Sequence, residues 1–160
     1  MPPSIRPATE ADVPLILAFI RELAEYERLP HEVVATEATL RRTMFGPRPE
    51  AEVLLADLDR GPVGFAVFFP TYSTFLGRSG IHLEDVFVRP AARGRGVGRA
   101  LLAEVARIAV SRGSGRLEWA VLDWNESAIG FYRSLDARPM DEWTVYRLDG
   151  EGLARLGSGG

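Results

Sequence analysis

The chain has 160 residues, of which 46% are hydrophobic and 26% are charged. These values are typical of a soluble globular domain that is large enough to bury a hydrophobic core. The formal net charge of −3 gives no overall basic signal, so we expect no nucleic-acid partner and no membrane partner. Cysteine is absent, which excludes disulfides, thiolate metal sites and a cysteine nucleophile.

The 19 Lys+Arg positions are all arginine. Without lysine the chain has neither a Walker-type phosphate loop nor Schiff-base chemistry. The two histidines, His31 and His82, lie far apart in the sequence, and we expect no bound metal. No apolar run approaches the ~20 residues that span a bilayer, and the N-terminus lacks a signal-peptide pattern. We therefore expect a cytoplasmic protein.

The N-terminal part predicts a short strand followed by two helices. Residues 4–7 form the strand, and Thr9 with Asp12 resembles a capping box. Apolar residues then recur at helical spacing, which predicts a helix from about Glu10 to Glu27. Thr36 is expected to cap a second, short helix that ends at residues 46–47.

The rest of the chain alternates between predicted strands and helices. A hairpin, a long loop and a further strand come first, at residues 52–69, 70–80 and 81–88. A helix, a strand, a helix and a last strand follow, at 97–113, 116–122, 125–135 and 144–148. This order predicts an α/β fold, a mixed and mostly antiparallel central sheet with helices on both faces. We expect one domain, 1–156, and a flexible tail, 157–160.

Two acids interrupt the apolar strand at residues 81–88. Because neighbouring strand residues point to opposite sides, Glu84 and Asp85 are expected to place one carboxylate on each face of the sheet. A buried, unpaired carboxylate costs several kcal/mol or takes up a proton. A core strand that retains two such acids usually pairs them or uses them in chemistry. Alternatively, both lie at the exposed end of the strand or bond to neighbouring backbone. We interpret His82 as a partly exposed strand residue.

A glycine-rich basic loop follows this strand and leads directly into a helix. Gly94, Gly96 and Gly98 alternate with Arg95 and Val97, and Arg93 and Arg99 flank them. Glycines let the backbone approach a ligand closely, and amides at a helix start favour a negative charge. The pattern predicts a site for a phosphorylated ligand. The spacing differs from the dinucleotide fingerprint G-x-G-x-x-G, which weakens a nucleotide-dependent oxidoreductase as an alternative.

The loop resembles the acetyl-CoA loop of the GCN5-related N-acetyltransferase (GNAT) superfamily, [RQ]-x-x-G-x-[GA], through Arg93, Gly96 and Gly98. Residues 21–27, 83–88 and 124–132 are similar to segments of its diamine (spermidine/spermine) acetyltransferase branch. The similarity runs from Ile5 to Leu148. The family commonly has glycine where this chain has Asp136, which can adopt a left-handed helix cap. The segment 138–143 is shorter than the corresponding segment of the animal diamine enzymes, so the identity of the acceptor amine stays open.

The resemblance implies a GNAT-like fold, acetyl-CoA as cosubstrate, a small-molecule amine as partner, and a homodimer. Its cofactor-binding residues would be Val86, Phe87, Val88, Arg93, Gly94, Arg95, Gly96, Val97, Gly98, Arg99, Asn125, Ser127 and Tyr132. Its acceptor-binding residues would be Tyr26, Glu27, Glu84, Asp85 and Glu142.

Acetyl transfer from a thioester requires an unprotonated amine, a stabilised carbonyl oxygen and a proton for the leaving thiolate. With a pKa near ~10.4, an alkyl ammonium costs roughly 4 to 5 kcal/mol to hold neutral at about pH 7. We expect Tyr132 to be the acid and Glu84 the base, acting through water, with direct transfer in a ternary complex. Asn125 could instead serve only as a helix cap, and Tyr132 only as a core aromatic.

These residues predict an N-acetyltransferase acting on a small cationic amine, such as a polyamine, a diamine or a lysine-like amino acid. A protein N-terminus, a lysine side chain or an aminoglycoside is an alternative acceptor. A module that binds acetyl-CoA without turnover is an alternative from another class, although the retention of Glu84 and Tyr132 argues against it.

Overall fold

The computed structural model describes residues 2–159. These residues fall into two compact units, Met1–Ala120 and Val121–Gly160. The first unit contains the whole sheet and the glycine-rich loop, and the second contains the predicted Tyr132 helix. The expectation of one domain, 1–156, stays a prediction.

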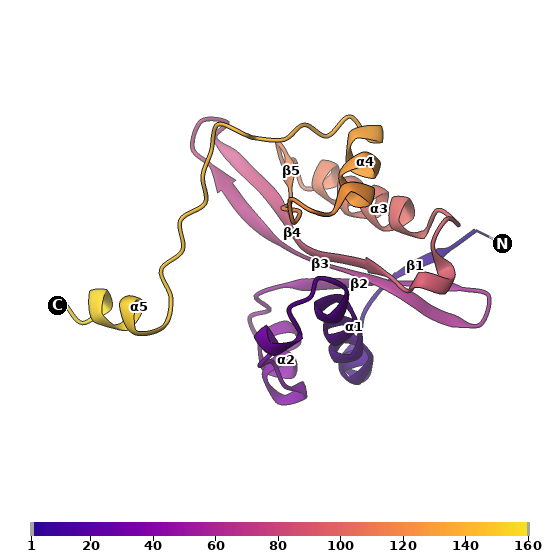
Figure 1. The fold of residues 1–160 in the computed structure, drawn as a ribbon, viewed down its shortest axis with the longest axis horizontal. Helices are drawn as coiled ribbons and strands as arrows, with labels where there is room; N and C mark the ends of the chain where they lie inside the picture. The colour runs from indigo at the N-terminus through magenta and orange to yellow at the C-terminus, as the bar shows by residue number, and fades with distance from the viewer. Residues whose placement is uncertain (1, 160) are drawn as a thin grey trace. The chain divides into compact units, whose positions relative to one another are not determined.

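The sheet of the first unit is mixed and mostly antiparallel, as the sequence predicts. Its strands follow one another in chain order, and the first four are antiparallel to their neighbours while β5 runs parallel to β4 (Figure 1). The strands are β1 (Ser4–Pro7), β2 (Glu52–Leu58), β3 (Gly61–Ser73), β4 (Arg78–Val88) and β5 (Leu117–Glu118).

Helices cover both faces of this sheet. Figure 1 shows α1 (Val13–Tyr26) and α2 (Glu37–Met44) on one side and α3 (Val97–Ser111) on the other. The first helical turn, Glu10–Asp12, is a separate 3₁₀ helix, and Pro14 follows in the first turn of α1. Because proline lacks an N–H, it is compatible with the first turn of a helix but not with its interior. Two further 3₁₀ helices are Pro30–Glu32 and Pro90–Ala92.

The core on the α1 face is built from aromatic and aliphatic side chains at helical and strand spacing. Phe19 of α1 stacks on Phe65 of β3 with ring centroids 5.2 Å apart, and Phe87 of β4 lies edge-on to Phe19 at 6.4 Å. All three rings are almost fully buried. This packing fixes the middle of α1 against β3 and β4, the strand that carries the two acids.

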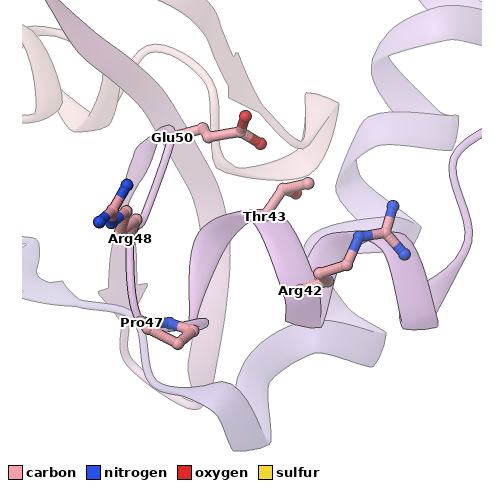
Figure 2. Close-up of a pocket in the computed structure, with 5 residues that line it drawn as sticks. All are labelled: Arg42, Thr43, Pro47, Arg48 and Glu50. Atoms are coloured by element: carbon pink, nitrogen blue, oxygen red, sulfur yellow. The ribbon is translucent and has the colours of Figure 1, made fainter.

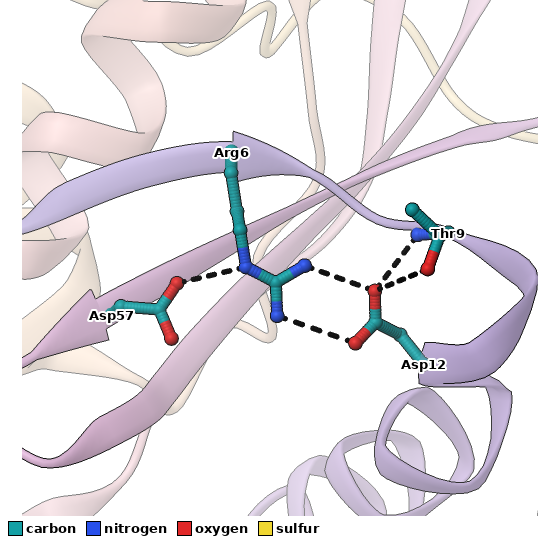
Figure 3. A network of polar contacts seen from close by, with 4 residues as sticks. All are labelled: Arg6, Thr9, Asp12 and Asp57. Atoms are coloured by element: carbon teal, nitrogen blue, oxygen red, sulfur yellow. Dashed lines mark hydrogen bonds and ion pairs between the residues drawn. The ribbon is translucent and has the colours of Figure 1, made fainter.

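A polar network ties the N-terminal strand to its neighbours (Figure 3). The Arg6 guanidinium donates through Nε to Asp57 at 3.0 Å, and through Nη1 and Nη2 to Asp12 at 3.0 and 3.2 Å. Asp12 also accepts from the backbone N–H of Thr9 at 2.8 Å. The predicted capping box is thus confirmed, and Asp12 joins it to the first two strands.

Two strand lengths differ from the prediction. The segment 70–80, expected to be a loop, extends the β3–β4 hairpin, and pairing continues as far as Ser73 and Arg78. The expected strand 116–122 contains only Leu117 and Glu118, which pair with Ile81 and His82 of β4. An apolar pattern becomes a strand only where a neighbouring strand supplies hydrogen-bond partners.

The second unit contains α4 (Glu126–Ser134) and α5 (Gly150–Gly157). Asp136 follows α4 with φ +63°. Its N–H donates to the Arg133 carbonyl, and the Ala137 N–H donates to the Tyr132 carbonyl, so the predicted left-handed cap is confirmed.

The predicted last strand, 144–148, is wrong. Within the described chain these residues have no strand partner, and Val145 and Tyr146 are 89% and 93% exposed. Helix α5 was not expected, and it includes Gly157 of the predicted tail, whose last residue, Gly160, lies outside the described residues. No helix within residues 2–159 combines the length and the apolar character needed to cross a membrane.

Candidate active site

A β-bulge sets the positions of the two strand acids. Phe68 of β3 pairs with Leu83, but the preceding Val67 pairs with Asp85, so Glu84 is an extra residue in β4. Asp85 therefore shares the α1 face of the sheet with Val67 and Phe87. The bulge resets the strict alternation of side chains.

The expectation of one carboxylate on each face is consequently wrong. Glu84 lies 3.3 Å from His82, measured from Oε2 to Nε2. His82 pairs with Phe69 of β3 and packs against its ring at 5.0 Å, and Phe69 shares its face with Val67. Glu84 and Asp85 thus both lie on the side of the sheet that α1 covers.

A third acid joins them from the end of α1. Burial, together with the nearby charges of Glu84 and Glu27, raises the pKa of Asp85 to about 7. Burial also raises the pKa of Glu27, which caps the C-terminal end of α1. The structure thus brings Glu27, Glu84 and Asp85 together, as the sequence predicts for a site that attracts a cationic amine.

His82 is partly exposed, as expected, but its contact with Glu84 was not anticipated. Its side chain is 31% exposed and that of Glu84 is 57% exposed. The spacing of two residues along a strand, which puts side chains on one face, is the signal that could have predicted this pair.

The strand after the bulge has a free edge within the first unit. β4 pairs with β3 along its whole length, but it pairs with β5 only at Ile81 and His82. The backbone of Val86, Phe87 and Val88 therefore has no strand partner on the β5 side within Met1–Ala120. An edge of this kind can accept an extended ligand by main-chain hydrogen bonds.

The glycine-rich loop has the backbone shape that a phosphate site needs. Gly94 and Gly96 adopt φ +77° and +80°, and a Cβ added at either would meet no atom within 4 Å. Helix α3 begins at Val97, and the first helical hydrogen bond runs from the Ala100 N–H to the Gly96 carbonyl. The amides of residues 97–99 therefore lack acceptors within the helix, and their arrangement fits a diphosphate.

The three arginines of the loop have different surroundings. The Arg93 Nε donates to the Val88 carbonyl at 2.9 Å, and its guanidinium lies 4.7 Å from the Tyr26 ring centroid. Arg95 donates to Asp59 at 2.8 Å. Arg99 has no ion pair within residues 2–159 and is exposed at the start of α3. Arg93 thus links the loop to the end of α1, where Tyr26 and Glu27 lie.

The remaining predicted site residues belong to the second unit. The Asn125 side chain accepts from the Ala128 N–H at 3.3 Å and caps α4, and Ser127 lies in the first turn. Tyr132 lies two turns into this helix, as expected, with its ring 5.7 Å from that of Phe131. Glu142 is exposed in a segment without regular structure.

A hollow of about 430 Å³ lies elsewhere in the first unit, at the end of α2. Figure 2 shows the guanidinium groups of Arg42 and Arg48 on opposite sides of Thr43, with Glu50 and Pro47 completing the lining. None of the predicted site residues lines it, and its charged groups do not converge. Residues 2–159 also contain no group of three His, Asp or Glu placed to hold a metal ion.

Comparison with known proteins identifies the family. The model of the Acetyltransferase (GNAT) family matches residues 18–136. The chain belongs to this family. GNAT enzymes use acetyl-CoA as their cosubstrate, and this acetyltransferase transfers the acetyl group to an amine.

Several relatives cover almost the whole acetyltransferase. It is 40% identical to the thialysine N-epsilon-acetyltransferase of Bos taurus, with 95% of each chain covered. It is 35% identical to the L-ornithine N5-acetyltransferase NATA1 of Arabidopsis thaliana, with 95% of this chain and 86% of the relative covered. A solved integron cassette protein of V. cholerae has a TM-score of 0.81 at 27% identity, with 98% of each chain covered. The predicted GNAT-like fold is thus confirmed.

Proposed function

We propose that the acceptor is a small primary amine with a cationic side chain, and in particular a lysine-like amino acid. The observation that carries this proposal is the group of three carboxylates, Glu27, Glu84 and Asp85, at one end of α1. Their negative charge favours an ammonium group over a neutral amine. The relatives named for thialysine and ornithine support an amino acid over a polyamine.

The cosubstrate is proposed to bind along two features of the first unit. The diphosphate of acetyl-CoA lies on the amides at residues 94–99, with Arg99 as a free cation beside it. The pantetheine arm pairs with the free edge of β4 at residues 86–88. Asn125 and Ser127 of α4 are proposed as further contacts.

Tyr132 is proposed to protonate the leaving thiolate. A phenol with a pKa near ~10 is well matched to a thiolate leaving group. The acetyl group of acetyl-CoA moves directly to the amine in a ternary complex. Glu84 and Tyr26 are proposed to bind the acceptor, with Glu142 of the second unit as an additional acid. Sequence alone predicts Glu84 as the base acting through water, and Asp85 is the second candidate for this role in the same group of acids.

Release of the CoA thiol tests the function. Wild-type protein is assayed with acetyl-CoA against thialysine, lysine, ornithine, spermidine, a peptide with a free N-terminus and an aminoglycoside. We expect the highest kcat/KM with one of the three amino acids. A preference for the peptide or the aminoglycoside would contradict the proposed acceptor, and stabilisation by acetyl-CoA without thiol release would favour a binding module.

A homodimer and a cytoplasmic location also stay proposals, as does a single domain spanning both units. Light scattering after size-exclusion chromatography measures the mass of the particle in solution, and a mass of one chain would contradict the dimer.

A further inference from the structure

We infer that Asp85, rather than its neighbour Glu84, is the group that takes the proton from the acceptor amine. This inference rests on the proposed function and assigns a role inside the same site. It follows from the position of the two carboxyl groups relative to the bulge, from their partners, and from the charges that surround them.

The bulge separates the two acids by their access to water. Asp85 pairs with Val67, which is 4% exposed, and shares its face with Phe87, which is 5% exposed. Glu84 is the extra residue, and 57% of its side chain is exposed. Asp85 is thus half-buried at the margin of the α1 core, where water screens its charge less than that of Glu84, which extends into solvent.

The fold does not use the Asp85 carboxyl as a structural group. Within residues 2–159 the carboxyl makes no hydrogen bond and no ion pair, whereas Glu84 has His82 at 3.3 Å. A carboxyl retained for stability is normally paired, because burying it alone is costly. An unpartnered carboxyl beside a predicted cosubstrate edge is instead suited to chemistry.

Charged groups from two elements face Asp85, and the nearest are negative. Glu84 precedes it in β4, with His82 beyond, and Glu27 approaches from the end of α1. Arg93, a cation of this region, lies over the rings of Tyr26 and Phe87. Burial and the two acids raise the pKa of Asp85 to about 7, which is the range in which a general base works best at neutral pH.

The proton balance of the step is simple. The ammonium of the acceptor gives one proton to the Asp85 carboxylate, and the free amine attacks the thioester carbonyl. The new C–N bond forms as the C–S bond breaks, and Tyr132 gives its phenolic proton to the thiolate. The second amine proton leaves through solvent, which restores the Tyr132 phenol. Asp85 then returns its proton to solvent. No oxidant or metal takes part.

Asp85→Asn and Glu84→Gln form a matched pair, since each removes one negative charge from the same site. We measure kcat and KM for the acceptor from about pH 5.5 to about pH 9.5 at saturating acetyl-CoA. We expect Asp85→Asn to lower kcat by about 100-fold or more and to abolish the acid limb of the profile. Glu84→Gln should raise the KM of the acceptor and retain the acid limb.

Binding of acetyl-CoA, measured by calorimetry, should be unchanged in both variants, and Asp85→Glu should restore part of kcat. An unchanged kcat in Asp85→Asn overturns the inference. So does loss of the acid limb in Glu84→Gln, and this result stands even if Asp85→Asn does not fold. A wild type that releases no thiol with any amine overturns the proposed function, whereas wild-type turnover that survives Asp85→Asn overturns only this inference.

Discussion

Replacing Asp85 by asparagine should stabilise the protein at neutral and alkaline pH. In the folded protein the pKa of this carboxyl rises from 3.8 to about 7, because burial and the charges of Glu84 and Glu27 disfavour its ionised form. An acid with a raised pKa destabilises the folded state once it ionises. The loss of folding stability begins as the pH rises above 3.8 and reaches its full size above about pH 7.

The magnitude follows from the two pKa values. The interval from 3.8 to about 7, at about 1.36 kcal/mol for each pH unit, corresponds to about 4 kcal/mol above pH 7. At about pH 5 only about 1.5 kcal/mol of this cost is present. The amide of asparagine is neutral, like the protonated carboxyl. The cost of burying the amide is therefore close to the cost of burying the protonated carboxyl, and the two largely cancel when the variant is compared with wild type. We therefore expect Asp85→Asn to gain about 2–4 kcal/mol at about pH 8.5 and roughly 40% of that gain at about pH 5.

Urea unfolding followed by tryptophan fluorescence measures this difference at the two pH values, and equal m-values show that both proteins unfold alike. Glu84→Gln is the control. Its side chain is 57% exposed, so the free energy of unfolding should change by no more than about 0.5 kcal/mol. If the difference in unfolding free energy between Asp85→Asn and wild type does not increase as the pH rises, the argument that this carboxyl is desolvated is refuted. The same burial would then no longer support it as a base.

Three further substitutions test other parts of the structure. Tyr132→Phe should lower kcat at least about tenfold with little change in the Kd of acetyl-CoA, and an unaltered kcat with transfer rate-limiting removes the phenol from the mechanism. Asp12→Asn should cost about 1 kcal/mol of unfolding free energy, a value kept small because Arg6 is 40% exposed. The hydrogen bond from Arg6 lowers the pKa of Asp12 below 3.8, so wild type keeps this stability above that pH and loses it on acidification. Circular dichroism during acid titration should therefore show the two proteins converging. Gly96→Ala should strain the loop by about 1–2 kcal/mol at φ +80° and weaken acetyl-CoA binding in calorimetry, whereas Gly130→Ala in α4 should not.

The local features of the chain could be predicted from sequence because short-range chemistry fixes them. Thr9 and Asp12 form the expected capping box, and Thr36 caps α2 by accepting from the Thr39 N–H. Asp136 takes the expected left-handed conformation after α4. Glycine spacing predicted the start of α3. Each of these depends on residues within one or two helical turns of one another.

Pairing between strands could not be predicted in this way. The alternation rule placed Glu84 and Asp85 on opposite faces, but the extra residue at the bulge puts both on the α1 side. Residues 144–148 have a strand pattern and no strand. A segment with a strand-like pattern forms a strand only if a partner strand elsewhere in the chain pairs with it, and the local pattern does not contain that information.

The mixed fold, the phosphate-type loop and the family could be predicted from the residues alone, because caps, glycines and apolar periodicity act over short distances. Three findings came from the folded structure: three acids meet at the end of α1, Asp85 is the one whose burial raises its pKa most, and β4 has no strand partner beyond His82 on the β5 side within the described part of the first unit. These properties arise from register and burial, which bring together residues as distant in sequence as Glu27 and Asp85, and from the dielectric environment that packing creates.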